Sequence, residues 1–137
     1  MGLSLDTELR YLTSISEDGM LQITDINTKE PIFEQLLNPI GLKYMLDDKE
    51  NKWLFIADGE GWVYIFEKKQ YPPELVLKIQ THSKACIWSM TIDEHKLYLF
   101  VCDVNGFINT FTLGAVGKER FAKQASEMKG LIKCWVI

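Results

Sequence analysis

The chain has 137 residues and a formal net charge of −4 at pH 7, and 47% of its residues are hydrophobic. This length and composition are typical of a single folded domain and exclude a disordered, highly charged segment. The acidic balance argues against a nucleic-acid-binding surface. No apolar run approaches the roughly 20 residues of a membrane-spanning helix, so we expect neither nucleic-acid partners nor membrane insertion.

Short runs of β-branched and aromatic residues between turn signals predict strands along most of the chain. The predicted strands are, in chain order, Tyr11–Ile15, Met20–Ile26, Ile32–Leu37, Gly41–Leu46, Trp53–Ala57, Trp62–Lys68, Glu74–Ile79, Ala85–Ile92, Leu97–Cys102, Phe107–Leu113 and Leu131–Ile137. The segment Lys118–Ala125 fits either a strand or a helix. Residues 1–10 are expected to form a lead-in without a strand.

One hairpin sequence occurs three times. Each copy is an apolar run, a tight turn and a second alternating run, and the turn glycines Gly19, Gly61 and Gly106 lie 42 and 45 positions apart. Asp-Gly and Asn-Gly turns between alternating runs are strong hairpin signals, because Gly and Asn tolerate positive φ angles. A repeat of about 40–50 residues built from short strands is typical of propeller blades, each a sheet of four antiparallel strands.

The strand count predicts an all-β fold, a partial β-propeller with about three four-stranded blades. Residues 11–38 would supply the second, third and fourth strands of a blade that lacks its first strand, a. Residues 39–80 and 81–125 would form two blades, and residues 126–137 would give the lone first strand of a further blade. Propellers usually close with about four to eight blades. We therefore expect further blades from the same chain, from another chain, or from a second copy in a six-bladed homodimer.

The repeated turns resemble those of the WD-repeat family. The stretch from Ser14 to Gly19, followed by Thr24-Asp25, is similar to the family's Ser-x-Ser-x-Asp-Gly turn and its Trp-Asp dipeptide. In the later copies Glu60 and Asn105 stand at the turn aspartate, and Thr81-His82 is similar to the Gly-His that opens a repeat. The resemblance implies structural roles within the blades for Ser14, Ser16, Asp18, Asp25, Phe66, His82, Asn105 and Phe111.

No copy keeps the whole polar network that rigidifies a WD-repeat blade. Aromatic side chains each bury a large apolar area, so their packing is expected to replace the missing polar contacts. The aromatic residues expected to do this are Trp53, Trp62, Phe66, Trp88, Tyr98, Phe111 and Trp135.

Catalytic and metal-binding motifs are missing from the sequence. The two histidines, His82 and His95, belong to no nucleophile or zinc motif, and the acidic loops lack the EF-hand pattern. We therefore expect no catalytic residue, metal or cofactor. The alternative is a fragment of a propeller hydrolase or lactonase, which would need carboxylates, histidines or asparagines around a metal. The three scattered cysteines favour reduced thiols and a cytoplasmic setting, possible cytoskeletal or ciliary contexts included.

The resemblance implies a non-catalytic scaffold for protein–protein interaction. In a WD-repeat blade the turn between the second and third strands and the loop that leads to the next blade share one rim. Carboxylates on that rim would favour basic peptides or proteins. The alternative is that Asp and Asn occupy these turns for backbone reasons alone. The rim residues interpreted as partner-binding are Glu17, Asp18, Asp58, Glu60, His82, Ser83 and Asp103.

Overall fold

The computed structural model describes residues 2–6, 10–50, 52–93, 95 and 98–112, and the backbone of residues 134–136. The strands of these residues form three antiparallel sheets, each with four strands. The first sheet contains β1 (Gly2–Leu5), β2 (Tyr11–Ile15), β3 (Met20–Asp25) and β4 (Glu30–Leu36), and the second contains β5 (Leu42–Asp48), β6 (Trp53–Asp58), β7 (Trp62–Glu67) and β8 (Glu74–Gln80). The third contains β9 (Ile87–Ile92), β10 (Tyr98–Asp103), β11 (Ile108–Thr112) and β12 (Cys134–Val136).

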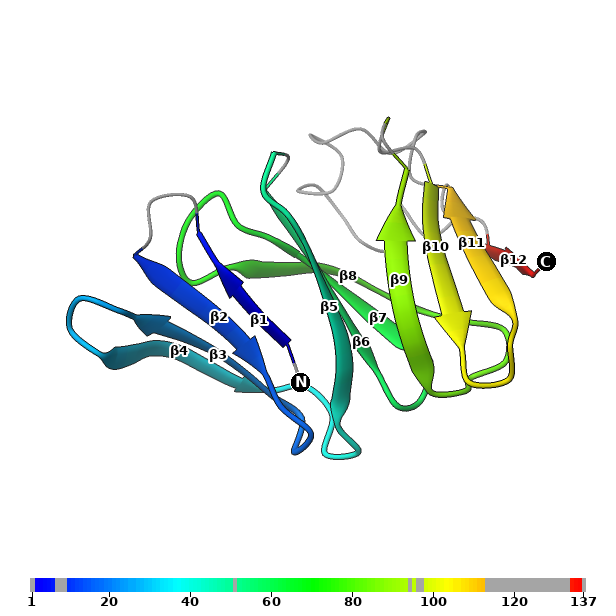
Figure 1. Ribbon diagram of the computed structural model, residues 1–137, viewed down its shortest axis with the longest axis horizontal. Helices are drawn as coiled ribbons and strands as arrows, with labels where there is room; N and C mark the ends of the chain where they lie inside the picture. Colours follow the sequence, from blue (N-terminus) through cyan, green and yellow to red (C-terminus); the bar gives the residue numbers. More distant parts are fainter. Residues whose placement is uncertain are drawn as a thin grey trace.

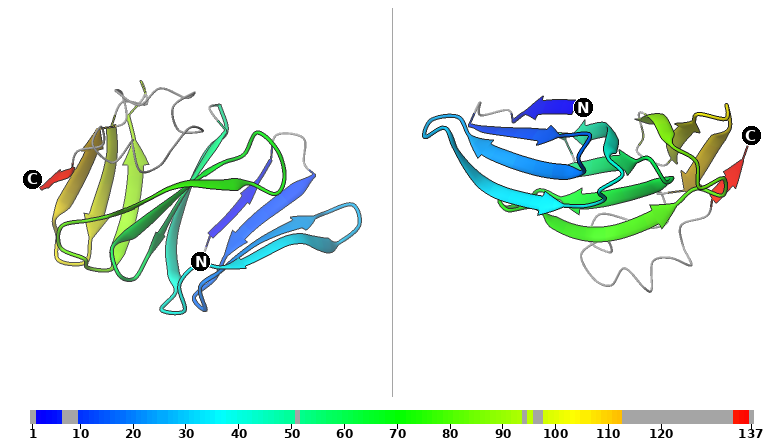
Figure 2. Two further views of the ribbon diagram at one scale, coloured as in Figure 1. Left: turned by 180° about the vertical axis from the view of Figure 1, so that it is seen from behind. Right: turned by 90° about the horizontal axis from the view of Figure 1, so that it is seen from below.

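The three sheets follow one another in space as they do in the sequence, with the second sheet between the other two (Figure 1). Strand β5, the first strand of the second sheet, contacts β1 on one side and β9 on the other. The first strands of the sheets therefore lie next to each other, and the later strands of each sheet fan outward (Figure 2). This arrangement, together with the antiparallel order within each sheet, is that of consecutive propeller blades.

Two apolar cores hold the sheets together. The core between the first and second sheets includes Ile15 and Leu21 on one side and Leu54, Ile56 and Phe66 on the other. The core between the second and third sheets is larger, and its buried members include Trp53, Phe55, Val63, Ile65, Leu77, Ile87, Met90, Leu99, Val101 and Phe111. Side chains alternate across a strand, so the second sheet contributes to both cores.

The structure corrects the prediction that the first blade lacks its first strand. Residues Gly2 to Leu5 form β1, which pairs antiparallel with β2 from Gly2 opposite Ile15 to Leu5 opposite Leu12. The short sequence Gly-Leu-Ser-Leu alternates small or polar residues with leucine, which suits a strand with one apolar face. By pairing there, β1 occupies a β2 edge that would otherwise expose unpaired backbone groups.

The last strand is corrected in the same way. Strand β12 pairs antiparallel with β11, with Cys134 opposite Phe111 and Val136 opposite Asn109. It is therefore the fourth strand of the third sheet and not the first strand of a further blade. Because the first and third sheets each have four strands, a second copy is not needed to complete either of them. The segment Lys118–Ala125, predicted as strand or helix, lies outside the described residues.

The expected aromatic packing holds for some residues and is wrong for others. Trp53, Phe66 and Phe111 are buried, but Trp88 is 70% exposed and Tyr98 is 38% exposed. On β10, Cys102 pairs with Ser89 of β9, and the next residue, Asp103, pairs with Ile87. Trp88 of β9 therefore has no partner residue and is the extra residue of a β-bulge. A bulge changes the direction in which a side chain points. The side chain of Trp135 lies outside the described part of the chain.

Candidate functional site

One end of the three sheets carries a continuous set of loops, which we call the turn rim. It consists of the turns between the second and third strand of each sheet, at residues 16–19, 58–61 and 103–106. It also includes the connectors between sheets, at residues 38–41 and 81–86. All of them lie at the lower end of the sheets in Figure 1. The glycines Gly19, Gly61 and Gly106 have φ angles of 93°, 83° and 86°, in the region that favours glycine.

The turns and connectors of this rim are tied together through the backbone. The amide of Leu42 donates to the carbonyl of Ser16 at 3.1 Å, and that of Thr81 donates to the carbonyl of Gly61 at 2.9 Å. In the third sheet the amide of Val104 donates to the carbonyl of Cys86 at 2.9 Å. Because each turn is bonded to the connector beside it, the rim is a supported surface and not a set of independent loops.

Asp58 is the centre of a buried polar network in the second sheet. Its side chain is fully buried and accepts hydrogen bonds from the Asn38 amide at 2.8 Å and the Tyr64 hydroxyl at 2.9 Å. The backbone amides of Glu60 and Trp62 donate to its other oxygen at 2.8 and 3.0 Å. Burial, followed by the nearby Asp58 carboxylate, raises the pKa of Tyr64, so its hydroxyl stays a hydrogen-bond donor.

Asp103 occupies the same turn position in the third sheet. The Ser83 hydroxyl donates to it at 2.5 Å, and the amides of Asn105 and Phe107 donate at 2.9 and 3.1 Å. Burial alone would raise the pKa of Asp103, but the hydrogen bonds from Ser83 and the two amides lower it below its ordinary value. In both the second and the third sheet, a side chain from the preceding connector therefore holds the turn aspartate in place by a hydrogen bond.

The first sheet has a different turn. Ser16 stands where Asp58 and Asp103 stand in the other sheets, and its hydroxyl donates to Asp18, which is exposed. The amide of Met20 also donates to Asp18, at 3.3 Å. These two hydrogen bonds, the one from Ser16 first, lower the pKa of Asp18 below its ordinary value. Asp18 therefore remains a carboxylate on the surface of the rim.

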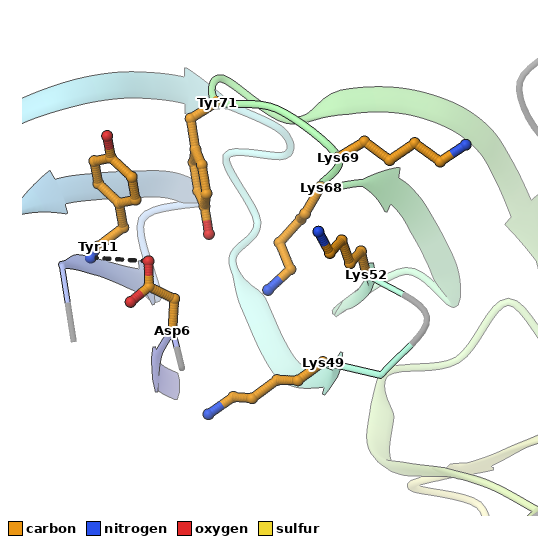
Figure 3. A pocket seen from close by; sticks show the side chains of 7 residues that line it. All are labelled: Asp6, Tyr11, Lys49, Lys52, Lys68, Lys69 and Tyr71. Carbon is orange, nitrogen blue, oxygen red and sulfur yellow. Dashed lines mark hydrogen bonds between the residues drawn. The ribbon is translucent and has the colours of Figure 1, made fainter. Parts of the chain in front are cut away.

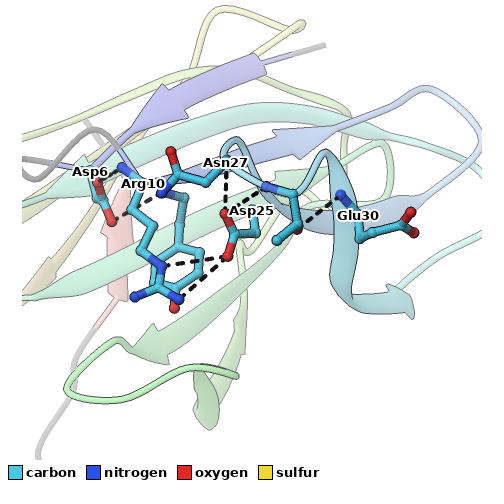
Figure 4. A network of polar contacts seen from close by, with 7 residues as sticks. Asp6, Arg10, Asp25, Asn27 and Glu30 are labelled. Atoms are coloured by element: carbon cyan, nitrogen blue, oxygen red, sulfur yellow. Dashed lines mark hydrogen bonds and ion pairs between the residues drawn. The ribbon is translucent and has the colours of Figure 1, made fainter.

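Asp25 supports the turn between β3 and β4, at the other end of the first sheet (Figure 4). It accepts hydrogen bonds from the amides of Asn27 at 2.9 Å and Thr28 at 3.4 Å, and Arg10 forms an ion pair with it at 3.4 Å. The Asn27 amide is the main cause of the lowered pKa of Asp25. This aspartate therefore stabilises a turn outside the rim.

The structure separates the predicted rim residues into two groups. Glu17, Asp18, Glu60 and His82 are exposed, and Ser83 is half-buried. Asp58 and Asp103 are only 0% and 2% exposed, and their carboxylates are used by the networks above. They support the rim from inside, because a buried charge requires internal hydrogen-bond partners.

The residues predicted to have structural roles are similarly divided. Phe66 and Phe111 are buried in the cores, and Ser14 lies half-buried on β2. Asn105 is exposed, and its position as the turn aspartate is taken by Asp103, two residues earlier. Ser83, next to His82, donates a hydrogen bond from the connector to the turn aspartate Asp103.

Sequence reasoning missed Asn38 and Tyr64, the two side chains that bind Asp58. A signal exists for Tyr64: Asp58 and Asp103 each stand three residues before a turn glycine, and Tyr64 and Asn109 each stand three residues after it. A carboxylate at the end of a buried strand needs donors nearby. The polar residues at those matched positions were therefore candidates.

Sequence reasoning also missed an apolar component of the rim. Ile40 in the first connector is 57% exposed, and Val104 and Phe107 at the third turn are 51% and 47% exposed. Exposed apolar side chains on the same surface as charged groups are characteristic of interaction surfaces. The rim therefore offers carboxylates and apolar side chains on a supported backbone.

The described residues contain no group of three or more histidine, cysteine, aspartate or glutamate side chains that could hold a metal ion. No helix among them is long and apolar enough to cross a membrane.

The known proteins found to resemble this chain are solved structures. No family model matches the chain, and no curated protein matches it. The crystal structure of the Myceliophteria thermophila Cps50 (Swd1) beta-propeller domain superimposes with a TM-score of 0.71 and 9% identity, covering 98% of this chain and 36% of that one. A chain in the crystal structure of the Mitotic Checkpoint Complex gives a TM-score of 0.65 and 9% identity, covering 80% of this chain and 32% of that one.

The fold is a partial β-propeller. The predicted all-β, partial-propeller class is thereby confirmed, and each four-stranded sheet is one blade. The chain spans about a third of the length of the two similar chains. At 9% identity the likeness concerns the fold.

Proposed function

We propose that this propeller segment is a non-catalytic scaffold that binds a protein or peptide through the turn rim. The observation that carries the proposal is the combination of exposed carboxylates and exposed apolar side chains on one rim. Glu17, Asp18 and Glu60 supply the charge, and Ile40 and Phe107 are among the apolar side chains. One of the similar structures is, by its title, part of a complex, which supports protein partners for this fold.

The partner class follows from the chemistry of the rim. Carboxylates attract lysine or arginine and accelerate association, and apolar side chains supply contacts that persist once water is excluded. The partner is therefore a basic segment that also carries an apolar anchor. Both features are needed, because exposed ion pairs alone contribute only about 0.2–1 kcal/mol each.

The test is selection of peptides from a random library against the purified chain, followed by affinity measurement on the enriched sequences. We expect enrichment of lysine or arginine next to an apolar residue. The variant E17K/D18K/E60K should weaken binding of the selected peptide at least about tenfold, because three attractive charges become repulsive. The control variant E30K/E34K/E74K reverses three exposed carboxylates outside the rim and should bind like the unmodified chain. Equal binding by both variants would reject the rim as the site.

We further propose that the two outer faces of the segment pack against additional blades, from the same chain, another chain or a second copy. Leu3 and Leu36 on the first sheet are 73% and 54% exposed, and Tyr98 and Ile108 on the third sheet are also exposed. Two copies would give six complete blades that meet face to face. Light scattering tests the homodimer, since a concentration-independent monomer mass contradicts it.

A cytoplasmic setting is part of the same proposal. Cys86 and Cys102 are free thiols, which suits a reducing compartment. Imaging of the tagged chain in intact cells tests this, and a purely secreted signal would contradict it.

A further inference from the structure

A lysine-rich pocket lies at the rim opposite the turn rim, at the seam between the first and second sheets (Figure 3). Its volume is about 210 Å³, and lysine supplies four of its seven lining side chains. Lys49 and Lys52 flank the turn between β5 and β6, and Lys68 begins the loop between β7 and β8. Tyr11 and Tyr71 form the wall on the side of the first sheet.

The pocket is built from contacts that join the two sheets. Asp47 on β5 accepts a hydrogen bond from Ser4 of β1 at 2.5 Å and forms an ion pair with Lys68 at 2.5 Å. The side chains of both Asp47 and Lys68 are more than nine-tenths buried. The rings of Tyr11 and Tyr71 meet with their centroids 4.4 Å apart. These contacts fix the walls, so the pocket does not depend on free surface side chains alone.

The charges around the pocket do not all cancel. Lys68 is paired with Asp47, and Lys69 points away from the pocket and pairs with Glu67 at 2.8 Å (Figure 3). Asp6 accepts hydrogen bonds from the backbone amides of Arg10 and Tyr11.

Lys49 and Lys52 are exposed, and no ion pair joins either of them to another residue within the described part of the chain. Lys52 also has a φ angle of 59°, an uncommon conformation for a residue with a side chain. The pocket therefore has two cations available to a ligand.

The hydroxyl of Tyr71 adds a donor. Burial first, and then the carboxylates of Asp6 and Asp47, raise the pKa of Tyr71 to about 12. Near neutral pH the hydroxyl therefore keeps its proton, and it points into the pocket in Figure 3. A protonated phenol beside ammonium groups favours an acceptor-only, negatively charged ligand.

We propose that this pocket binds the phosphate group of a small soluble phosphate ester through Lys49, Lys52 and the Tyr71 hydroxyl, with the ion pair between Lys68 and Asp47 as part of its wall. Lysine is a point-charge binder of phosphate, and a phosphate group supplies several strong acceptor oxygens. The volume is smaller than the roughly 300–1,000 Å³ of pockets that enclose drug-sized ligands, so a terminal phosphate fits better than a whole cofactor. This proposal does not rest on the proposed function, because the pocket and the turn rim lie at opposite ends of the sheets.

The experiment is an NMR titration of the full 137-residue chain with inorganic phosphate as the probe. We expect saturable shifts of the backbone amides at residues 49–52 and 68–71. The variant K49Q/K52Q should bind phosphate about tenfold more weakly, because it removes the two unpaired cations. The control K29Q/K78Q removes the same charge from exposed lysines outside the pocket and should bind like the unmodified chain. Circular dichroism confirms that each variant keeps its strand content.

The pH dependence provides a second readout. Phosphate gains its second negative charge near pH 6, so its affinity should rise between about pH 5 and pH 7.5. Sulfate is already a dianion over that range and should show a much smaller change. Vesicles that carry a phosphorylated lipid headgroup form a further arm: binding to vesicles but not to free phosphate would overturn the soluble-ester assignment. Absent shifts, or equal weakening by both variants, would overturn the site.

Discussion

The second sheet is covered on both faces, whereas the first and third sheets each have one uncovered face, and their strands differ accordingly. In β6, Trp-Leu-Phe-Ile-Ala-Asp, every residue is buried. In β2, Tyr-Leu-Thr-Ser-Ile, only Thr13 and Ile15 are buried. A strand enclosed on two sides is apolar at successive positions, and a strand enclosed on one side alternates. The local sequence therefore indicates which sheet lies in the middle.

The outward face of the first sheet carries a row of polar side chains that the second sheet lacks. Ser14 pairs with Gln22, and Gln22 pairs with Glu34, so a polar row crosses three strands. The corresponding rows of the second sheet contain Leu54, Phe66 and Leu75, or Phe55, Ile65 and Leu77. A neighbouring blade on the first sheet would have to bury that polar row or leave it in water. The outer faces therefore suit a partly polar contact better than a second apolar core.

The largest effect is expected in the core between the second and third sheets. Phe55 is fully buried and packs edge-on against Trp53, with ring centroids 6.1 Å apart. We expect Phe55→Ala to lower the free energy of unfolding by about 3–5 kcal/mol, the usual cost of emptying a buried phenylalanine site. Urea denaturation followed by tryptophan fluorescence measures it.

The matched control is the same substitution at the turn rim. Phe107 is 47% exposed, so Phe107→Ala should lower the free energy of unfolding by less than about 1 kcal/mol. Similar losses for Phe55→Ala and Phe107→Ala would contradict the difference between the central sheet and the outer sheets.

The next effect concerns the buried network of the central sheet. Asp58→Ala removes the acceptor of two backbone amides and one of the two acceptors of both the Asn38 amide and the Tyr64 hydroxyl. Each unsatisfied buried group costs about 1–3 kcal/mol, and partial relaxation reduces the sum, so we expect a loss of about 3 kcal/mol. Thermal unfolding measures it. Asp58→Asn keeps an acceptor oxygen and should lose less, and equal losses would contradict the role assigned to these hydrogen bonds.

These networks show how far the sequence alone leads. The alternating runs and turn signals predicted eleven of the twelve described strands and the partial propeller, because strand alternation and glycine turns are local properties. The first strand was missed because its four residues are too short a run to establish the alternating pattern. Asp58 and Asp103 were interpreted as surface carboxylates, because their burial depends on Asn38 and Ser83, which lie 20 residues away in the sequence. Contacts of that range are set by the packing of connectors on turns and not by local pattern.

A glycine pair separates backbone strain from packing on the connector. Gly61 and Gly106 occupy equivalent turns with φ angles of 83° and 86°. A Cβ atom at residue 61 would lie 2.5 Å from Thr81 Oγ1 and 2.9 Å from Lys84 Cα, whereas one at residue 106 would meet nothing within 4 Å. Both alanine substitutions cost about 1 kcal/mol for the backbone conformation, and Gly61→Ala should cost about 2 kcal/mol more for the overlap. Equal shifts of the urea midpoint for Gly61→Ala and Gly106→Ala would show that the connector at residues 81–86 moves aside without an energetic cost.

The smallest effect tests the turn of the third sheet through its pH dependence. Hydrogen bonds lower the pKa of Asp103 below its ordinary value, so this carboxylate stabilises the fold above about pH 4, and the stabilisation is lost as the pH falls through its lowered pKa. Ser83→Ala removes the hydroxyl that donates to Asp103 and should raise that pKa toward its ordinary value.

We therefore expect Ser83→Ala to lower the free energy of unfolding by about 1 kcal/mol at pH 7 and by less at pH 3, where the carboxylate is increasingly protonated. Ser89→Ala is the matched control, because Ser89 lies half-buried on β9 in the same sheet. Urea unfolding at the two pH values measures both variants. All carboxylates are present in both variants, so the protonation of the carboxylates other than Asp103 changes both free energies of unfolding equally. A loss for Ser83→Ala that is the same at both pH values would show that the serine supports the connector without acting on Asp103.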